Sequence, residues 1–325
     1  MNWKRRRTLP SSSVKTVAIV GGTHGNETNG VHLAKHFMRN PALVKRPSFE
    51  TEVLLSNVAA IQQNTRYVEE DLNRCYLLED LQNDAKSTST LERKRAREVD
   101  AQLGPKSSSE PKCDFIIDLH NTTAATGVAL LMAPNDEFAH EVAHHLMSLD
   151  ETVRVVEWND QADWPLCPSI GRSGLTFEVG PCPWGCLEPE LFQQSRRLVM
   201  ALLDYVEKHN SLVASGSPTR QEVSMKVFRS IGVSIDYPRA GEDPVGHAPG
   251  ASTGRAACFC RREGGGVRVT QIFLPCQFAI LENVLGLLKV IDEVKEALTE
   301  CGDYEMTLQE LDPTHGYALA VSGDS

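Results

Sequence analysis

Residues 17–27 of the chain read VAIVGGTHGNE: a short apolar run, two glycines, and then a histidine and a glutamate three positions apart. The apolar run predicts a buried strand, and Gly21 and Gly22 let the backbone turn where a side chain would clash. His24 and Glu27 are both residue types that bind zinc, and their i, i+3 spacing lets both side chains point at one ion from a single turn. This stretch therefore predicts half of a metal site.

The composition is that of an ordinary globular protein, with 41% hydrophobic and 23% charged residues in a chain of 325. A chain of this length can bury a large core and is expected to form one large domain or two smaller ones. The net charge of -10 argues against binding to bulk nucleic acid, because that requires a basic surface. An anionic small substrate would meet a repulsive overall field, so local arginines would have to bind it.

The sequence contains neither an apolar run near the ~20 residues that span a membrane nor a secretory signal. We interpret the basic, Ser-rich residues 1–13 as a disordered tail, with an organellar presequence as the alternative. The nine cysteines include no C-x2-C pair, and the spacings of Cys182 with Cys186 and of Cys258 with Cys260 do not suit a structural zinc site. We therefore expect reduced thiols and a cytoplasmic location.

Apolar periodicity predicts strands and helices that alternate along the first two thirds of the chain. This alternation predicts an α/β domain with a largely parallel or mixed sheet over residues 14–210. The strands are expected at 14–22, 51–56, 114–120, 127–133, 153–158 and 175–179, and the helices at 26–37, 91–103, 136–149 and 196–209.

The composition and the apolar periodicity of the sequence change after Asn210. Residues 210–220 are rich in Ser, Pro and Gly, which is typical of a linker. The remaining expectations are short β-like runs at 221–237 and 267–275, a poorly ordered Gly- and Arg-rich stretch at 239–266, an amphipathic helix at 277–300 and a loosely structured stretch over the last 25 residues.

Three strand ends carry residues suited to metal chemistry. His24 and Glu27 follow the first strand, His120 ends the run FIIDLH, and Glu178 lies near the end of LTFEV. Ligands of open α/β sheets bind outside the carboxyl ends of the strands, so these side chains converge if the three strands are parallel neighbours. Considered singly, each has a plainer explanation: a turn histidine, a hydrogen-bonded histidine at a strand end, and a glutamate on the solvent face of a strand.

Two histidines and one glutamate form a known catalytic zinc set that leaves a fourth position open for water. Bound zinc lowers the pKa of that water towards ~7 and polarises a substrate carbonyl, and a separate carboxylate is then needed to carry the proton. Glu178 is the candidate for that carboxylate. Asp118, two residues before His120, is expected to point the same way and to orient the histidine.

A polar stretch between the two halves of this site suggests anion binding. Asn73 and Arg74 are adjacent and could hold a carboxylate, since a guanidinium fork matches a carboxylate in a bidentate way. Arg66 could stabilise the oxyanion of a tetrahedral intermediate. The alternative explanation of this stretch is a surface loop of ion pairs.

Four motifs, GGTHGNE, TRYVEEDLNR, DFIIDLHNTTA and FEVGP, resemble those of aspartoacylase and its relative aminoacylase III, in the same order and at compatible spacing. The resemblance implies a zinc carboxypeptidase-like fold with a central mixed, largely parallel sheet, followed by a smaller, divergent β-containing region. It covers residues 14 to about 239. We accordingly divide the chain into a catalytic domain at 14–212 and a C-terminal region at 213–325, after the tail.

The resemblance also implies a role for each residue of the site. Glu178 would be the general base and acid of a zinc-dependent hydrolase that cleaves N-acyl-L-amino acids to a carboxylate and an amino acid. Arg66 would polarise the scissile carbonyl. The zinc ligands would be His24, Glu27 and His120, with one Zn²⁺ per chain, and the α-carboxylate would bind to Asn73 and Arg74.

Two positions depart from the pattern of aspartoacylase. An arginine that binds the aspartate side chain is replaced by Pro168, and a tyrosine four residues earlier is replaced by Trp164, which we expect to contact the substrate. Arg172 is a nearby candidate for the missing charge. Loss of a charge-assisted bond costs about 2–3 kcal/mol, or roughly two orders of magnitude in discrimination, which favours aromatic or S-conjugated cysteine substrates over N-acetylaspartate.

The C-terminal region departs further, because the family's aromatic-rich motif with a substrate-contacting tyrosine is not recognisable there. Residues 240–325 contain Tyr304 and Tyr317, neither in a matching context. Two alternatives to the main hypothesis therefore stay open: an aspartoacylase that acts on N-acetylaspartate, and a catalytically impaired protein that binds zinc or its ligand. Relatives of this type form dimers, so a homo-oligomer is expected by resemblance.

Overall fold

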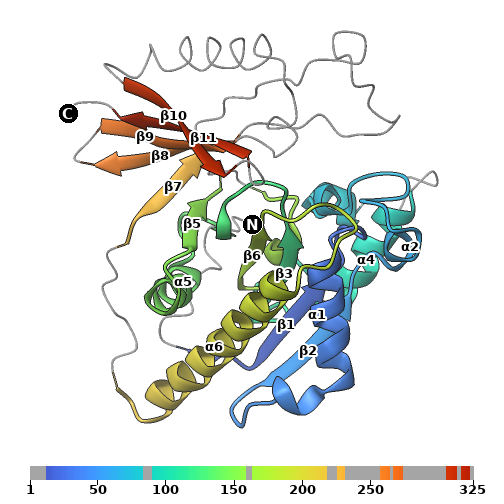
Figure 1. Cartoon of the computed structure of the whole chain (residues 1–325). Helices are drawn as coiled ribbons and strands as arrows, with labels where there is room; N and C mark the ends of the chain where they lie inside the picture. The colour runs from blue at the N-terminus through green and yellow to red at the C-terminus, as the bar shows by residue number, and fades with distance from the viewer. Residues whose placement is uncertain are drawn as a thin grey trace. The chain divides into compact units, whose positions relative to one another are not determined.

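The computed structural model describes two compact units of the chain (Figure 1). The first comprises residues up to 225 except 123–126, and the second comprises those four residues with 226–325. The described residues are 12–82, 90–158, 163–217 and 225–230, together with the strands at 257–263, 266–273, 305–312 and 316–322.

A mixed, mostly parallel sheet forms the centre of the first unit, in the strand order β5-β4-β6-β3-β1-β2. The ladders from β2 through β1 and β3 to β6 are parallel, β4 pairs antiparallel with β6, and β5 pairs parallel with β4. The strands are β1 (Thr16–Gly21), β2 (Glu50–Leu55), β3 (Phe115–Asn121), β4 (Gly127–Met132), β5 (Val153–Glu157) and β6 (Ser173–Gly180).

The central strand β3 is buried along its whole length, as a strand with neighbours on both sides and helices on both faces should be. Its apolar run FII supplies core residues, while its last residues are polar. The register sets His120 beside Glu178 of β6 and Leu119 beside Gly21 of β1. The carboxyl ends of three parallel strands therefore meet at one edge of the sheet.

Helices cover both faces of this sheet. On one face α1 contacts β1, β2 and β3, and α5 and α6 pack together beside it. On the other face α4 packs with the short 3-10 helices η3 and η4. The helices are α1 (Thr28–Arg39), η2 (Pro41–Leu43), α2 (Val58–Gln63), η3 (Leu72–Arg74), α3 (Leu78–Gln82), α4 (Leu91–Leu103), α5 (Glu137–Leu149), η4 (Cys167–Ile170) and α6 (Pro189–Ala214).

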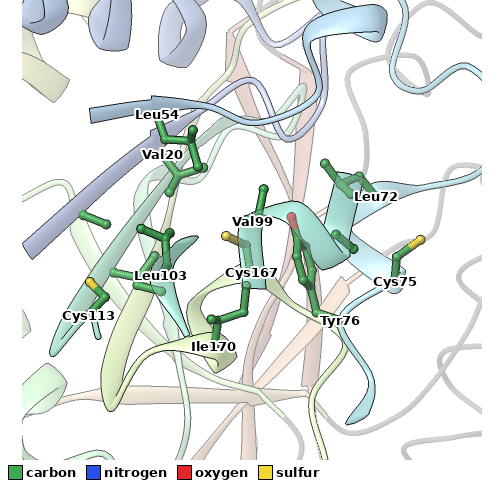
Figure 2. Packing of buried hydrophobic residues seen from close by; sticks show 13 residues of the cluster. Val20, Leu54, Leu72, Cys75, Tyr76, Val99, Leu103, Cys113, Cys167 and Ile170 are labelled. Carbon is green, nitrogen blue, oxygen red and sulfur yellow. The ribbon is translucent and has the colours of Figure 1, made fainter. Parts of the chain in front are cut away.

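Figure 2 shows the hydrophobic cluster between the sheet and the elements that cover its second face, α4, η3 and η4. Tyr76, which is fully buried, lies beside Cys167 of η4, while Val99 and Leu103 of α4 pack toward the strands. Burial of a side chain of this size stabilises the fold by about 1.5–3 kcal/mol. The cluster thus fixes the segments on either side of Tyr76 and Cys167 against the sheet.

Asp136 joins α5 to the sheet and shows why the helix begins where it does. Its Oδ1 accepts from Ala139 N at 3.1 Å as an N-cap and from Ser173 Oγ at 2.6 Å, and its Oδ2 accepts from Gly174 N at 3.2 Å. An N-cap of this kind contributes about 1 kcal/mol. The predicted helix start at Asn135 or Asp136 is therefore confirmed at Asp136.

The predicted strands and helices of the first unit are confirmed, with ends that shift by a few residues. The exception is α6, which begins at Pro189 and continues to Ala214, so the linker predicted for 210–220 is wrong over its first five residues. Proline is favoured in the first helical turn, where its missing N–H costs nothing, and this signal at Pro189 was overlooked.

The second unit contains an antiparallel ladder in the order β10-β11-β9-β8-β7. The strand β9 confirms the β-like run predicted near 267–275, and β7 confirms part of the run at 221–237. The strand β8 lies within the stretch 239–266 that was expected to be poorly ordered, and β10 and β11 lie within the last 25 residues, which were expected to be loosely structured. The helix predicted at 277–300 lies outside the described residues. The strands are β7 (Val227–Ser230), β8 (Ala257–Glu263), β9 (Gly266–Phe273), β10 (Glu305–Asp312) and β11 (Gly316–Ser322).

Two further findings bear on the expectations from composition. Among the described residues, no helix combines the length and the apolar character needed to cross a bilayer. The described cysteines of the first unit are free thiols: Cys75, Cys113, Cys167, Cys182 and Cys186.

Candidate metal and active site

The loop between β1 and α1 carries the first two candidate ligands. Gly22 has a φ of 74°, a conformation that side-chained residues rarely adopt. A Cβ on Gly25 would lie 2.1 Å from the backbone of Ala60, so glycine is required there as well. After this turn the Glu27 N–H donates to the His24 carbonyl at 3.2 Å, and Glu27 becomes the N-cap of α1. The turn brings His24 Nδ1 to 2.7 Å from Glu27 Oε1.

The third candidate ligand comes from the end of β3. His120 Nδ1 lies 2.7 Å from Glu27 Oε2 and 3.1 Å from His24 Nδ1. One ligand atom from each of the three residues lies within 4.8 Å of the others, and all three residues are buried. The structure thus brings together the three residues that the sequence predicted as zinc ligands.

Each histidine turns its second ring nitrogen to a carboxylate. His24 Nε2 lies 2.9 Å from Asp71 Oδ1, and His120 Nε2 lies 2.8 Å from Asp118 Oδ2. Thr23 Oγ1 in turn donates to Asp118 Oδ1 at 2.7 Å. Carboxylates in these positions fix the tautomer and the ring orientation of a metal-binding histidine.

This arrangement fits a bound metal cation. When both Nε2 atoms donate to carboxylates, neutral His24 and His120 each direct a lone pair from Nδ1 to the same point, only 3.1 Å apart. Two lone pairs at that distance repel one another, and the Glu27 carboxylate beside them adds negative charge. A cation removes the repulsion, and two imidazoles with one carboxylate are a ligand set typical of catalytic zinc.

Without a metal ion, protons take the place of the cation. Burial alone would lower the pKa of His120, but the Asp118 and Glu27 carboxylates outweigh burial and raise the pKa well above its usual value. Burial would likewise lower the pKa of His24, and Glu27 and Asp71 raise it. Burial would raise the pKa of Glu27, yet the two histidines hold it well below its usual range. The cluster therefore attracts positive charge at its centre.

Glu178 lies on β6 directly beside His120 in the register of the two strands. Burial raises the pKa of its carboxyl group to about 7; His120 opposes this rise, and the Glu27 carboxylate adds to it. A carboxyl group with a raised pKa beside a metal site can both accept and donate a proton near neutral pH. Its position suits the proton carrier that the sequence predicted.

Arg66 reaches the same cluster from the loop after α2. Its Nη1 donates to Glu27 Oε1 at 3.3 Å, and its Nη2 donates to Asp71 Oδ2 at 3.0 Å. The Arg66 side chain is 29% exposed, whereas that of Glu27 is 3% exposed. Arg66 is thereby held at the rim of the metal-ligand cluster.

Asn73 and Arg74 lie in η3, next to this cluster. Asn73 Nδ2 lies 3.5 Å from His120 Nε2, and its Oδ1 accepts from Cys167 N at 3.0 Å. Arg74 Nη1 donates to the Asn73 carbonyl at 2.8 Å. The amide of Asn73 is therefore engaged within the protein, while Arg74 brings a positive charge to the same 3-10 helix.

Comparison with known proteins identifies the family. Residues 13–206 match the model of the succinylglutamate desuccinylase/aspartoacylase catalytic domain, which covers more than half of the chain. The chain belongs to this family. The probable aspartoacylase of Nostoc sp. is 36% identical over 228 residues, which are 70% of this chain and 74% of that protein.

Two further family members have names that describe an activity. The N-acyl-aromatic-L-amino acid amidohydrolase (carboxylate-forming) of Homo sapiens is 36% identical over 247 residues, which are 74% of both chains. The crystal structure of murine aminoacylase 3 superposes with a TM-score of 0.65 at 35% identity, covering 74% of this chain and 79% of that chain. The chain is thus a hydrolase of amide bonds with the fold of this family.

Trp164 lies shortly before η4 and was expected to contact the substrate. Trp164 is 3% exposed and packs against Ala133, which follows the carboxyl end of β4. Because β4 runs antiparallel to β6, that end of β4 lies beside the amino end of β6 and not beside Glu178. The predicted contact between Trp164 and the substrate stays a prediction.

Arg172 does not replace the missing arginine of aspartoacylase. It lies just before the amino end of β6, where its N–H donates to the Cys113 carbonyl and its guanidinium pairs with Asp114 at 3.4 Å. Asp114 precedes the amino end of β3, whereas the candidate ligands lie at the carboxyl ends of the strands. The suggestion that Arg172 reads a substrate carboxylate is therefore wrong.

Sequence reasoning missed Asp71 and Thr23 as partners of the candidate metal ligands. Asp71 supports His24 across a separation of 47 positions, and no local pattern marks such a partner. Thr23 stands next to His24 in the first motif and supports the other histidine through Asp118. Its hydroxyl in a run of glycines at a strand end was the only sequence signal for that role.

Proposed function

We propose that this family member is a zinc-dependent amidohydrolase that cleaves N-acyl-L-amino acids to a carboxylate and a free amino acid. The observation that carries the proposal is the convergence of His24, Glu27 and His120 at one point, with Glu178 beside them on the next strand. A site that only binds a metal has no need of a carboxyl group poised to exchange protons near pH 7.

Zinc held by His24, Glu27 and His120 would supply a Lewis acid that polarises the acyl carbonyl and makes a nearby water more acidic. Glu178 accepts one proton from the attacking water, whose oxygen forms a bond with the acyl carbon. Glu178 then passes that proton to the amide nitrogen as the carbon–nitrogen bond breaks. The acid product gives its remaining proton to the free amine, so the products are a carboxylate and an amino acid with a protonated amino group, and Glu178 returns to its starting form.

Arg66 stabilises the negative charge that develops on the acyl oxygen. Its bonds to Glu27 and Asp71 orient the guanidinium in advance, so little reorganisation is needed during the reaction. Because Glu27 and Asp71 also contact the histidines, Arg66 is oriented by the same side chains that orient the ligands.

The α-carboxylate of the substrate binds at η3. Arg74 supplies the positive charge, and Asn73 fixes the backbone of η3 through its bond to Cys167 N. In a protein with a net charge of -10, such a local arginine is needed to hold an anionic substrate.

The preferred substrate carries an aromatic or S-conjugated cysteine side chain. Pro168 cannot pair with a side-chain carboxylate, and Arg172 is engaged with Asp114 at the other end of the strands. Relatives named for N-acyl-aromatic-L-amino acids support this preference. The alternative substrate is N-acetylaspartate, and relatives named probable aspartoacylase support this alternative. We place the reaction in the cytoplasm, where the free thiols found among the described cysteines of the first unit would persist.

A substrate panel at one zinc per chain tests this proposal. We expect kcat/KM for N-acetyl-L-tyrosine to exceed that for N-acetyl-L-aspartate by roughly two orders of magnitude, as loss of one charge-assisted bond implies. S-conjugated N-acetyl-L-cysteines should resemble the tyrosine derivative. Preference for N-acetyl-L-aspartate would support the aspartoacylase alternative. A folded, zinc-loaded protein that hydrolyses none of them would be a binding protein.

A further inference from the structure

Lys106 is a buried lysine that none of the steps above uses. It follows the end of α4, where its own N–H donates to Asp100 Oδ1 at 2.7 Å, and its side chain is 2% exposed. A buried ammonium loses its hydration, and an apolar side chain of similar volume would often be at least as stable in such a place. The positions of its partners therefore indicate what it does.

The ammonium of Lys106 connects two segments that are far apart in the sequence. Its Nζ donates to the Tyr76 carbonyl at 2.6 Å and to the Trp164 carbonyl at 2.5 Å. Asp163 Oδ1 lies 2.6 Å from the same nitrogen and forms an ion pair with it. A lysine carries three N–H donors and no acceptor, which suits a point where two carbonyls and a carboxylate meet.

Other bonds continue the connection between these two segments. Tyr76 N donates to the Pro165 carbonyl at 3.3 Å, and Leu78 N donates to Asp163 Oδ2 at 2.7 Å. At the other end, Cys167 N donates to Asn73 Oδ1. These hydrogen bonds form a series between the two segments. Lys106 lies at one end of the series, and the amide of Asn73 lies at the other end.

The Asn73 end of this series of hydrogen bonds lies next to the candidate metal ligands. Asn73 lies 3.5 Å from His120, and Arg74, which carries the positive charge of η3, is two residues before Tyr76. A shift of the Tyr76 carbonyl would move the backbone of η3 relative to His120. Figure 2 shows the Tyr76 ring beside Cys167, so the packing and the hydrogen bonds join the same two segments.

We propose that Lys106 is a positioning residue that locks residues 163–167 against residues 71–78 and thereby sets how η3 holds the substrate's carboxylate. The inference rests on the proposed function for its effect on substrate, although the locking itself does not. Because Lys106 acts on binding and not on proton transfer, its loss should raise KM more than it lowers kcat.

Kinetics of Lys106→Met test the effect on substrate, with Lys112→Met as the matched control. Lys112 also follows α4 and donates from Nζ to a carbonyl, that of Ala101, but it is exposed. For N-acetyl-L-tyrosine we expect Lys106→Met to raise KM about ten-fold or more and to change kcat less than about three-fold, at unchanged zinc content. Lys112→Met should resemble the wild type. An unchanged KM in the folded Lys106→Met protein would overturn the inference.

Fluorine NMR tests the locking without any need for activity. In protein labelled with 5-fluorotryptophan, the Trp164 signal is assigned by its absence in Trp164→Phe. We expect Lys106→Met to shift or broaden this signal and Lys112→Met to leave it in place; an unmoved signal in Lys106→Met would overturn the inference. If the wild type hydrolyses no substrate, the proposed function fails while this signal still decides the role of Lys106.

A milder variant serves if Lys106→Met does not fold. Asp163→Asn removes the ion pair but keeps an oxygen that can accept from Leu78 N and leaves the two carbonyl bonds of Lys106. We expect the same changes in KM and in the Trp164 signal, at smaller size. Absence of both changes in folded Asp163→Asn would contradict the proposal.

Discussion

His24 and His120 each place one ring nitrogen at the centre of the cluster and the other against a carboxylate. The carboxylates Asp71 and Asp118 do more than neutralise charge, because they determine which nitrogen is available to a metal ion. Asp118 is fully buried and is itself fixed by Thr23, so its orientation is rigid. Metal affinity should therefore depend on residues that do not touch the metal.

Asp118→Asn tests this dependence. The amide keeps the size of the carboxylate but lacks its charge, so the His120 ring becomes less basic and less firmly oriented. We expect zinc affinity to fall about 10–100-fold, measured by competition with a chromogenic chelator. The control is Asp204→Asn, which alters an exposed partner of Arg46 on α6 and should leave the affinity unchanged. Equal zinc affinity in Asp118→Asn and the wild type would contradict the assigned role of Asp118.

Single functional residues could be predicted from the sequence where they stand at the end of an apolar run that forms a strand. The candidate metal ligands and Glu178 lie at or near the ends of apolar runs, and the carboxyl ends of parallel strands meet at one edge. Asp71 and Lys106 could not be found in that way. Their partners lie 30 or more positions away, and only the packing of loops brings them together.

Among the elements, α5, β5 and α6 are joined through a single carboxylate at the end of α5. Asp150 Oδ1 accepts from Thr152 N at 2.9 Å and from Thr152 Oγ1 at 2.7 Å, just before β5. Its Oδ2 accepts from Gln194 Nε2 at 2.9 Å and from Arg197 Nη2 at 2.6 Å, both on α6. Burial would raise the pKa of Asp150, but the bonds from Gln194, Thr152 and Arg197 lower it from 3.8 to about 2.

This junction makes a pH-dependent contribution to stability. Because the folded-state pKa of Asp150 lies below its unfolded value, the contribution is fully present above about pH 4 and is lost as the pH falls through about 2. A shift of this size corresponds to at most about 2 kcal/mol at neutral pH, and solvent around the exposed Arg197 side chain reduces it towards about 1 kcal/mol. We expect Asp150→Asn to lower the free energy of unfolding by about that amount at pH 6, and the difference to shrink towards pH 2. Urea denaturation across this range measures it, and a difference that does not vary with pH would contradict the assignment.

The failure to predict some elements from the sequence has identifiable causes. The last helix of the first unit, α6, continues beyond its most periodic part in both directions, from Pro189 in its first turn to the residues after Asn210, whose side chain bonds to Val14 and Ser48. The strand β11 contains the continuous apolar run YALAV, a short run consistent with a buried strand, and β10 has apolar residues at Met306, Leu308 and Leu311 without a constant period. The strand β8 contains CFCRRE, where apolar and basic residues do not alternate, so no period marks it.

For the whole molecule, metal binding and folding should be linked. The three candidate ligands join β1, the start of α1 and β3, and the site exists only when these elements are assembled. A metal ion that binds the folded state alone stabilises it by about 2.7 kcal/mol at a free concentration of 100 times its Kd. We expect zinc removal by dipicolinate to lower the free energy of unfolding by a comparable amount, and re-addition of zinc to restore it.

Two variants separate this linkage from general effects of the chelator. His120→Ala should lose the response to zinc, because one of the three ligands is missing. Glu178→Gln should keep it, because Glu178 is not a ligand in the proposed site. A wild-type free energy of unfolding that is the same with and without zinc would mean that these residues do not hold the ion.

The most direct test of the proposed chemistry is turnover of N-acetyl-L-tyrosine by the wild type and by Glu178→Gln, each at one zinc per chain. The glutamine keeps the size and polarity of the side chain but cannot accept the proton of the attacking water. We expect kcat to fall by roughly 10²–10⁴-fold while zinc content and KM stay close to those of the wild type. Turnover by Glu178→Gln within a few-fold of the wild type would show that another group moves the proton and would contradict the proposed mechanism.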